Sequence, residues 1–301
     1  MARGSLSRRL GERIAAAPVL KPYPGWVLGS GERRGIAARM RRLLWPYLRE
    51  AFEVEWLEGL RLRLLPGNET SRAIFVTGRY EPNEFCVLDR VLQPGMTFVD
   101  AGANMGLYSL FAAGRVMPHG RVLALEPSRR EFEILVGNVE ANQLQNVRTL
   151  PVALSDRRGT AELLVAPLAN AGHNTLGSFG YGTALERREA VPVERLDDII
   201  RDEGIERVDM IKMDVEGAEM LALRGAAEVL RQFHPMLLLE VSDRTLQHQG
   251  SSSGEVLALL GSSGYRFYGF DPGSGLPRPL PANPDFDSVN VVALAGDAAP
   301  W

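Results

Sequence analysis

The chain has 301 residues, of which 45 % are hydrophobic, so it can bury a large core in one sizeable domain with an appendage or in two modest domains. Its net charge of −3 gives no overall attraction to nucleic acid, and its single cysteine, Cys86, excludes an intramolecular disulfide and a zinc cluster built on cysteines. No run reaches the roughly 20 apolar residues of a membrane span, and proline and lysine interrupt the short apolar run near the start. We therefore expect a cytoplasmic protein without a membrane span.

The first 49 residues are strongly basic. Ten arginines and Lys21 stand against Glu12 and Glu32, which gives this arm a net charge of +9. Two interpretations are open: a helical arm that packs on the core or on a second subunit of a homo-oligomer, or a face for an anionic partner or membrane surface. Apolar residues at helical spacing predict a helix over residues 33–49, which Pro46 bends or ends.

A β-hairpin is predicted next. Residues 52–69 alternate apolar and polar side chains on both sides of Glu58-Gly59, and Pro66-Gly67-Asn68 closes the hairpin. We assign residues 1–79 to an N-terminal helical arm and hairpin that cap a main domain over residues 80–301.

In the main domain, short apolar strands alternate with helices. The strands are expected at residues 97–102, 121–127, 147–156, 208–214 and 235–242, and the helices at 107–117, 128–144, 218–233 and 254–264. Continuous apolar strands separated by helices indicate a parallel sheet covered on both faces, an α/β fold. Residues 265–271 and 288–296 read as a strand pair whose connection holds no helix, so the last strand is expected to be antiparallel.

A long polar segment, residues 157–183, interrupts this alternation. It begins as a small hairpin and becomes a loop rich in glycine, asparagine and serine. Long loops inside a compact domain are more often functional than not, so we expect a role in the site.

The turn "FVDAGANMGLYSL" after the first parallel strand suits a cationic ligand. A dinucleotide-binding turn would read G-x-G-x-x-G and offer bare amides to a pyrophosphate. Here the pattern is Asp100-x-Gly102-x-x-x-Gly106, with Asn104 where the second glycine would stand. A carboxylate at this strand end repels a pyrophosphate and attracts a cation. S-adenosylmethionine has no phosphate and carries a sulfonium and an ammonium group.

A second acid ends the next strand. Glu126 lies about 20 residues further on, where a carboxylate accepts both hydroxyls of a ribose. Pro127 stops the strand, and Ser128 is expected to cap the following helix. NAD stays open as an alternative ligand, because Glu126 would serve its ribose equally well.

The segment "VDMIKMDVEGAE" is the other candidate for chemistry. Strand alternation puts Lys212 and Asp214 on one face, and Glu216 and Glu219 follow at once. Several charges at the end of a buried strand are costly unless they pair or act. The structural alternative is a buried pair of Lys212 with Asp100, Asp214 or Glu240.

Methyl transfer to a hydroxyl needs positioning and a base, or a metal that lowers the pKa of the hydroxyl. We expect Asp214 as the first candidate base and His173, in the polar loop, as the second. His119 and His234 are taken as structural, whereas His248 is a candidate substrate contact. Asp214, Glu240 and Asp243 offer oxygen ligands for Mg²⁺, but their spacing is no metal motif and no metal is predicted.

The main domain resembles the FkbM family of S-adenosylmethionine-dependent methyltransferases. The matching stretches run in family order from about residue 78 to 296: "GRYEP", "FVDAGANMGLYSL", "GRVLALEPS", "VGNVEAN", "PVALSD", "GHNTLGS", "VPVERLDDI", "VDMIKMDVEGAEMLALRGA", "PMLLLEV" and "VNVVAL". The resemblance implies a class I methyltransferase (Rossmann-like) fold, with a seven-stranded, mostly parallel sheet whose last strand is antiparallel. It also implies O-methylation of a hydroxylated small molecule such as a sugar or a polyketide-derived natural product.

The resemblance also implies site residues. Residues implied to contact S-adenosylmethionine are Tyr80, Glu81, Asp100, Gly102, Ala103, Asn104, Gly106, Glu126, Pro127, Ala153, Leu154, Ser155 and Asp214. Within this set, the turn after the first strand would hold the methionine part, Glu126 the ribose and residues 153–155 the adenine. The catalytic candidates are Asp214, Lys212 and His173, and the substrate-binding candidates are Glu216, Asn174, Glu240 and His248.

Other functions stay open. A nicotinamide-dependent oxidoreductase is disfavoured by the missing central glycine, and a non-catalytic cofactor-binding module by the retained Lys212, Asp214 and Glu216. Guidance to RNA by the basic arm is not expected, because its few aromatic residues form no stacking platform. The acceptor itself is not encoded in a readable motif; specificity is expected in the N-terminal cap and in the loops at residues 166–190 and 243–254.

Overall fold

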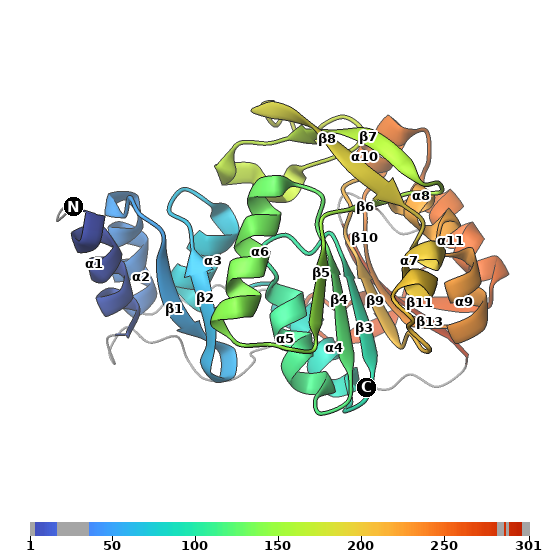
Figure 1. Ribbon diagram of the computed structural model, residues 1–301, viewed down its shortest axis with the longest axis horizontal. Helices are drawn as coiled ribbons and strands as arrows, with labels where there is room; N and C mark the ends of the chain where they lie inside the picture. The colour runs from blue at the N-terminus through green and yellow to red at the C-terminus, as the bar shows by residue number, and fades with distance from the viewer. Residues whose placement is uncertain (1–3, 17–35, 282–285, 287–288, 297–301) are drawn as a thin grey trace.

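The computed structural model describes residues 4–16, 36–281, 286 and 289–296. Helices α1 (Gly4–Ala16) and α2 (Ile36–Leu44) lie together at one end of the molecule (Figure 1). A 3₁₀ turn, η2 (Trp45–Tyr47), follows α2 and contains Pro46, so the helix ends where the proline predicts. The start of the predicted helix, residues 33–35, lies outside the described residues.

The predicted hairpin is present. Strands β1 (Phe52–Trp56) and β2 (Leu60–Leu64) pair antiparallel, with Phe52 opposite Leu64. The turn between them, η3 (Leu57–Gly59), holds Glu58 at φ 54° and Gly59 at φ 86°, the left-handed pair that matches the twist of a tight hairpin.

Helix α3 (Glu69–Thr77) follows the hairpin and was not predicted. Asn68 caps it by accepting a hydrogen bond from the Ser71 amide at 2.8 Å, and Gly78, at φ 75°, ends it in the left-handed region.

The central sheet has the order β12-β11-β13-β10-β9-β3-β4-β5. Its strands are β3 (Thr97–Ala101), β4 (Arg121–Leu125), β5 (Val147–Leu150), β9 (Met210–Met213), β10 (Met236–Val241), β11 (Tyr265–Phe270), β12 (Pro277–Pro279) and β13 (Val289–Ala295). Strands β3, β4, β5, β9 and β10 pair parallel, and β13 inserts antiparallel between β10 and β11. The expected seven-stranded arrangement is confirmed, with the short β12 added at one edge.

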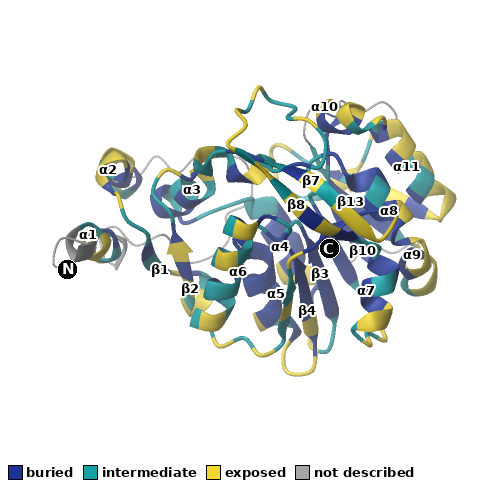
Figure 2. Ribbon diagram, turned by 45° about the horizontal axis from the view of Figure 1, so that its top comes forward, coloured by how far each residue is buried: buried dark blue, intermediate teal, exposed yellow. Residues whose placement is uncertain are grey.

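Helices cover both faces of the sheet (Figures 1 and 2). One face packs on α4 (Pro82–Val91) and α5 (Leu107–Val116), the other on α7 (Leu196–Asp202), α8 (Glu219–Arg224), α9 (Ala227–Phe233) and α11 (Ser253–Ser262). Alternation along β3 sends Phe98 into the first core and Val99 into the second. Helix α6 (Arg129–Ala141) lies between the sheet and the hairpin, and the short α10 (Asp243–Leu246) and η5 (Gln247–Gln249) follow β10.

A second, three-stranded sheet has the order β6-β8-β7. The strand predicted over residues 147–156 is in fact two: β5 ends before Pro151, and β6 (Ala153–Leu154) pairs with β8 (Arg187–Glu194). Proline offers no amide to continue the ladder, so the chain leaves the central sheet there. The small hairpin expected after residue 157 is also wrong, because β7 (Gly159–Val165) pairs antiparallel with β8, after η4 (Leu168–His173) and its loop.

The N-terminal segment shares a hydrophobic core with the main domain. Trp56 packs edge-on against Phe85 of α4, with ring centroids 5.5 Å apart, and its indole N–H donates to the Gly78 carbonyl at 3.2 Å. The Asn138 side chain of α6, 1 % exposed, accepts from the Arg63 amide of β2 at 2.9 Å and donates to the Met105 carbonyl at 2.8 Å. In the part of the chain that the structure describes, no helix has the length and apolar character to cross a membrane.

We expect Asn138→Ala to lower the free energy of unfolding by about 2 kcal/mol, because the buried Met105 carbonyl and the partly buried Arg63 amide lose their partners. Asn142→Ala is the matched control. Asn142 follows the last residue of α6, one turn after Asn138, and bonds both backbone groups of Arg61 at the surface. Water replaces it there, so a loss of about 1 kcal/mol or less is expected. Urea unfolding followed by circular dichroism measures both variants. Equal losses would contradict the assigned role of Asn138.

Candidate functional site

A cavity of about 540 Å³ lies at the carboxyl ends of β3, β4, β9 and β10. The chain moves outward from β3 to β4 and β5 and later returns to place β9 on the other side of β3. That reversal is a topological switch point, where open α/β sheets bind their ligands, because the connections leave β3 and β9 in opposite directions and open a crevice between them.

The turn after β3 needs both of its glycines. Gly102 has φ 75°, and a Cβ there would stand 1.9 Å from the Asp214 carbonyl oxygen. Gly106 has φ 91°, and a Cβ there would stand 2.6 Å from Leu135 Cδ1 on α6. Gly102 lines the cavity and Gly106 does not, so Gly106 serves the packing of α5 on α6.

The Glu126 carboxylate accepts hydrogen bonds from two neighbouring backbone amides. Its Oε2 accepts from the Asn104 amide and its Oε1 from the Ser128 amide, both at 2.8 Å. Burial raises the pKa of Glu126 to about 8, although these amides oppose the shift. Ser128 stands at the start of α6 as predicted, but its hydroxyl donates to Glu131 and does not cap the helix. The Asn104 amide is therefore not available to a pyrophosphate.

Asp100 does not face the cavity, which corrects the expectation that its carboxylate meets the ligand. It is fully buried in β3, where Oδ2 accepts from the Ser109 hydroxyl of α5 at 2.6 Å. Oδ1 lies 3.8 Å from Lys212 Nζ and has no hydrogen-bond partner in the described structure. Burial raises the pKa of Asp100, and Lys212 opposes that shift.

Lys212 joins the two central strands. It pairs in register with Asp100 across the sheet, and its Nζ donates to the Gly102 carbonyl at 2.9 Å and lies 3.3 Å from Asp214 Oδ2. Burial alone would lower the pKa of Lys212, but the carboxylates of Asp214, Asp100 and Glu81 outweigh it and the pKa is raised. The expected buried lysine–acid pair is present, and an ammonium held in this way cannot act as a base.

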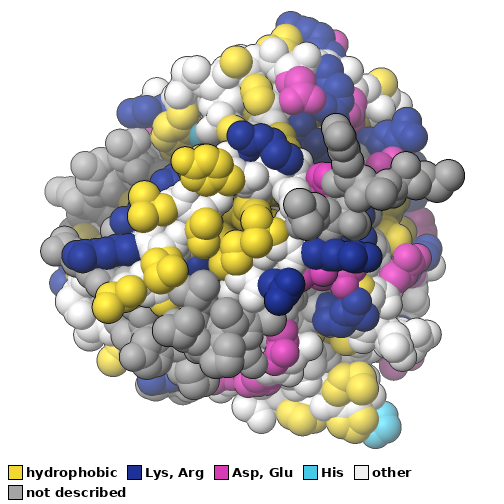
Figure 3. Space-filling view, turned by 90° about the vertical axis from the view of Figure 1, so that its left-hand side faces the viewer, with side chains coloured by type: hydrophobic (Ala, Val, Ile, Leu, Met, Phe, Trp, Pro, Cys, Tyr) yellow, Lys and Arg dark blue, Asp and Glu magenta, His cyan; other side chains and the backbone are white. Residues whose placement is uncertain are grey.

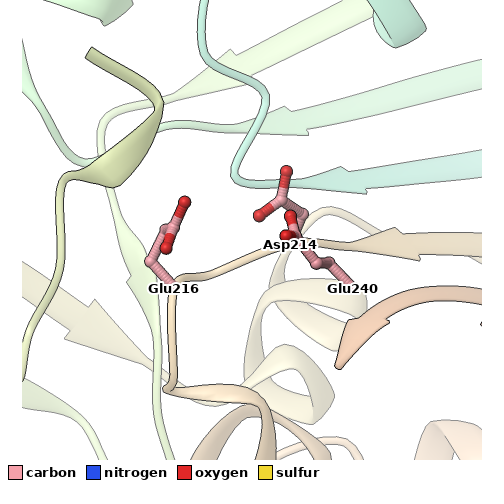
Figure 4. Close-up of side chains that lie close together, drawn as sticks. All are labelled: Asp214, Glu216 and Glu240. Atoms are coloured by element: carbon pink, nitrogen blue, oxygen red, sulfur yellow. The ribbon is translucent and has the colours of Figure 1, made fainter. Parts of the chain in front are cut away.

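Three carboxylates meet beside Lys212. Asp214 follows β9, Glu216 follows on the next turn and Glu240 lies in β10; one oxygen of each lies within 4.8 Å of the others (Figure 4). Burial raises the pKa of Glu216, and the charges of Asp214 and Glu240 raise it further. Such oxygens could hold a divalent cation. Asp243, which the sequence analysis offered as a third oxygen ligand, is not part of this group. Its carboxylate accepts hydrogen bonds from the Ser253 amide and hydroxyl.

The polar loop brings His173 to the cavity. His173 lies at the end of η4, and its Nδ1 is 2.8 Å from the Thr183 hydroxyl. Burial lowers its pKa, against the opposing charge of Asp214, so the ring is neutral at pH 7 and able to accept a proton. Asn174 also lines the cavity, but its side chain bonds the Ala166 amide and Glu131, which leaves little for a substrate.

Tyr80 and Glu81 line the cavity between α3 and α4. Glu81 Oε2 accepts from the Tyr108 hydroxyl at 2.5 Å, and burial raises the pKa of Glu81 to about 7. The Glu81 carboxylate and burial together raise the pKa of Tyr80 well above its usual value.

The remaining candidates divide into two groups. Four of them line the cavity: Ala103, Pro127, Ala153 and Leu154. Ser155 does not, since its amide bonds the Glu194 carbonyl and its own carbonyl lies close to Gly225. His248 lies outside the cavity too, exposed on η5 with Nδ1 3.0 Å from the Ser178 carbonyl.

One wall of the cavity comes from the N-terminal cap, where the sequence analysis expected specificity but named no residues. Asn68, Glu69, Thr70 and Ala73, at the start of α3, form this wall. The sequence gives only a weak signal for them, an asparagine after a turn that could cap a helix. Nothing local shows that this helix reaches the strand ends.

Comparisons with known proteins identify the family of this chain. Residues 100–267 match the family described as the methyltransferase FkbM domain. The chain is 34 % identical over 194 residues to methyltransferase sdnD of Sordaria araneosa, covering 56 % of this chain and 72 % of that protein.

Two further relatives carry more specific names. The 31-O-demethyl-FK506 methyltransferase FkbM of Streptomyces tacrolimicus is 29 % identical over 199 residues, covering 58 % of this chain and 74 % of that protein. The 2-O-methyltransferase NoeI of Sinorhizobium fredii is 26 % identical over 182 residues, covering 56 % and 73 %. The matched segment holds the turn after β3, Glu126 and the Asp214 turn, and it spans more than half of the sequence. This chain belongs to the FkbM methyltransferase family.

Proposed function

We propose that the protein is an S-adenosylmethionine-dependent O-methyltransferase that acts on a hydroxylated small molecule such as a sugar or a polyketide-derived natural product. The observation that carries the proposal is the charge of the cavity. Among the described residues that line the cavity, Lys212 is the one lysine or arginine. Six acidic residues line it: Glu69, Glu81, Glu126, Asp214, Glu216 and Glu240. Oxygen as the acceptor atom is supported by the names of the FkbM and NoeI relatives.

The cavity fits this cofactor better than a dinucleotide. A pyrophosphate needs free amides at the turn after the first strand, whereas here Glu126 takes the Asn104 amide. A sulfonium and an ammonium group are favoured by the same carboxylates that repel phosphate. Glu126 would receive the ribose hydroxyls, Ala153 and Leu154 would line the adenine, and the Gly102–Asn104 turn would border the methionine part.

When bound, S-adenosylmethionine supplies an activated methyl group, so the protein must orient the acceptor and remove its proton. Asp214 is the proposed base, because it stands at the strand end beside the other carboxylates and Lys212 fixes its position. His173, neutral and on the same cavity, is the second candidate. Glu216, with its raised pKa, would donate a hydrogen bond to the acceptor in its protonated form.

Calorimetry with three ligands tests the cofactor. We expect S-adenosylmethionine and S-adenosylhomocysteine to bind and NAD to give no heat, because the turn offers carboxylates where a pyrophosphate needs amides. NAD binding without a response to the first two would refute the proposed cofactor. Binding of the cofactor without turnover on any sugar or macrolide acceptor would favour a non-catalytic module.

Asp214→Asn tests the base. The variant should keep most of its affinity for S-adenosylhomocysteine and lose about 10²–10⁴ in kcat, the usual contribution of a positioned base. Formation of S-adenosylhomocysteine with an active acceptor measures kcat, and Asp202→Asn, an exposed acid on α7, is the control. If Asp214→Asn kept its turnover and His173→Gln lost it, the base would be His173.

Glu126 predicts a pH dependence of cofactor affinity. Its pKa of about 8 means that it is mostly protonated below pH 8 and ionised above, and ribose hydroxyls donate best to the ionised form. Affinity for S-adenosylhomocysteine should therefore rise about three- to tenfold from pH 6.5 to 8.5. Glu126→Gln should bind more weakly and lack this component. The amine of the ligand titrates in both experiments, so parallel pH profiles for the two proteins would refute the assignment.

A further inference from the structure

Helix α2 has a charged residue on its inner face. Ala38, Arg41, Trp45 and Leu48 are buried, and the Arg41 guanidinium, 2 % exposed, donates to the Phe75 carbonyl of α3 at 2.9 Å. Burial lowers the pKa of Arg41 to about 10. These contacts fix which side of α2 points inward.

The opposite face of α2 is apolar and open to solvent. Ile36, Met40, Leu43 and Tyr47 are 76 %, 45 %, 72 % and 73 % exposed. Their spacing of four, three and four residues places them in one stripe along α2 and η2. A surface helix normally packs its apolar face on the core and exposes its polar face. Since α2 exposes an apolar stripe, this surface is indicated as a binding surface.

The exposed apolar side chains are concentrated at this end. Of the seven large hydrophobic residues that are exposed among the described ones, five lie in α1, α2 or η2: Leu10, Ile36, Met40, Leu43 and Tyr47. We call these five residues the N-terminal face. The Ser7 hydroxyl of α1 accepts from the Arg49 amide just beyond η2 at 3.0 Å, so the two segments are in contact.

The surroundings of this face are cationic. Exposed arginines on α1 and α2 and just beyond η2 are Arg8, Arg9, Arg13, Arg39, Arg42 and Arg49. Figure 3 shows apolar side chains gathered in the middle of this end of the molecule, with Lys and Arg side chains around them. Residues 4–16 and 36–50 hold seven arginines and two acids, whereas the whole chain has a net charge of −3. Positive charge is therefore localised here.

We propose that the N-terminal face binds the surface of an anionic lipid bilayer, with α2 lying in the plane of the headgroups. Its apolar stripe would enter the boundary of the acyl chains, while the arginines reach the anionic headgroups around it. A second copy in a symmetric contact would bring Arg39 and Arg42 against the same residues, which like charges oppose. The phosphates of a nucleic acid would pair with the arginines but would leave the apolar stripe exposed to water. This proposal does not depend on methyl transfer.

Flotation of the full chain with vesicles tests the proposal. We expect binding to phosphatidylcholine vesicles that contain about 30 % phosphatidylserine, weak binding to phosphatidylcholine alone, and loss of binding in about 0.5 M NaCl. Ile36→Ser with Leu43→Ser should weaken the partition coefficient about tenfold or more. Arg39→Gln should weaken it about fivefold, because each cation near the surface contributes about that factor.

The control replaces exposed apolar residues that lie off this face, Met117→Ser with Leu185→Ser, and should leave partitioning unchanged. Thermal unfolding and S-adenosylhomocysteine affinity of all variants report whether the fold is intact. The proposal is overturned by absence of binding to the anionic vesicles, or by equal binding of the Ile36→Ser/Leu43→Ser variant. A dimer in light scattering that this variant dissociates, without vesicle binding, would assign the face to a second copy.

Discussion

The buried ammonium of Lys212 holds the centre of this protein together. It lies between the two strands on either side of the switch point, pairs with Asp100 in β3 and Asp214 after β9, and bonds the Gly102 carbonyl. Removing one partner from such a group would leave a buried charge uncompensated. The two strand ends lie so close beside this ammonium that only a glycine fits at position 102.

Around that cluster the protein gathers acids whose ionisation burial opposes. Glu81 and Glu219 have pKa values raised to about 7 and Glu126 to about 8, in each case mainly by burial. Glu219 also receives the amides of Val215 and Gly217 and so shapes the turn after β9. The cavity therefore carries less negative charge near neutral pH than its composition implies, and a cationic ligand would draw it toward the ionised state.

Backbone strain marks the same place. Among the residues that the structure describes, six other than glycine have positive φ, and three of these line the cavity: Glu81, Asn104 and Glu216. A long side chain in the left-handed region costs free energy and persists where its neighbours fix it. At Glu81 and Glu216 that conformation aims a carboxylate into the cavity. Asparagine adopts the left-handed region more easily, and the backbone N–H of Asn104 donates to the Glu126 carboxylate.

The N-terminal segment has two different sides. Its inner side continues the core of the main domain through Trp56, Phe75 and the Asn138 bonds, and α3 reaches the cavity wall. Its outer side, the N-terminal face, is apolar and basic. Arg41 belongs to the inner side, where a carbonyl of α3 receives it. The predicted domain boundary at residues 79–80 therefore separates two segments of the chain that share one hydrophobic core.

The sequence by itself determined the local features: the alternation that makes a parallel sheet, the tight turn at Glu58-Gly59, the stop at Pro46, and the turn from Asp100 to Gly106 with Glu126 after the next strand. These depend on residues close together in the chain, whose backbone preferences and periodicity act over a few positions. The carboxyl ends of parallel strands share one edge, so Lys212, Asp214 and Glu240 could be placed near that turn as well.

Only the tertiary structure decided which atoms face the ligand. Asp100 turns to Ser109 and Lys212, Asn174 to Ala166 and Glu131, and Ser155 to Glu194, because partners distant in sequence compete for the same polar groups. Hydrogen bonds hold His248 at the Ser178 carbonyl and Asp243 at the Ser253 amide, both outside the cavity. Helix α3 supplies a cavity wall that no local sequence motif indicates. A side chain's direction is set by the best available partner in three dimensions, and that information is not contained in spacing along the chain.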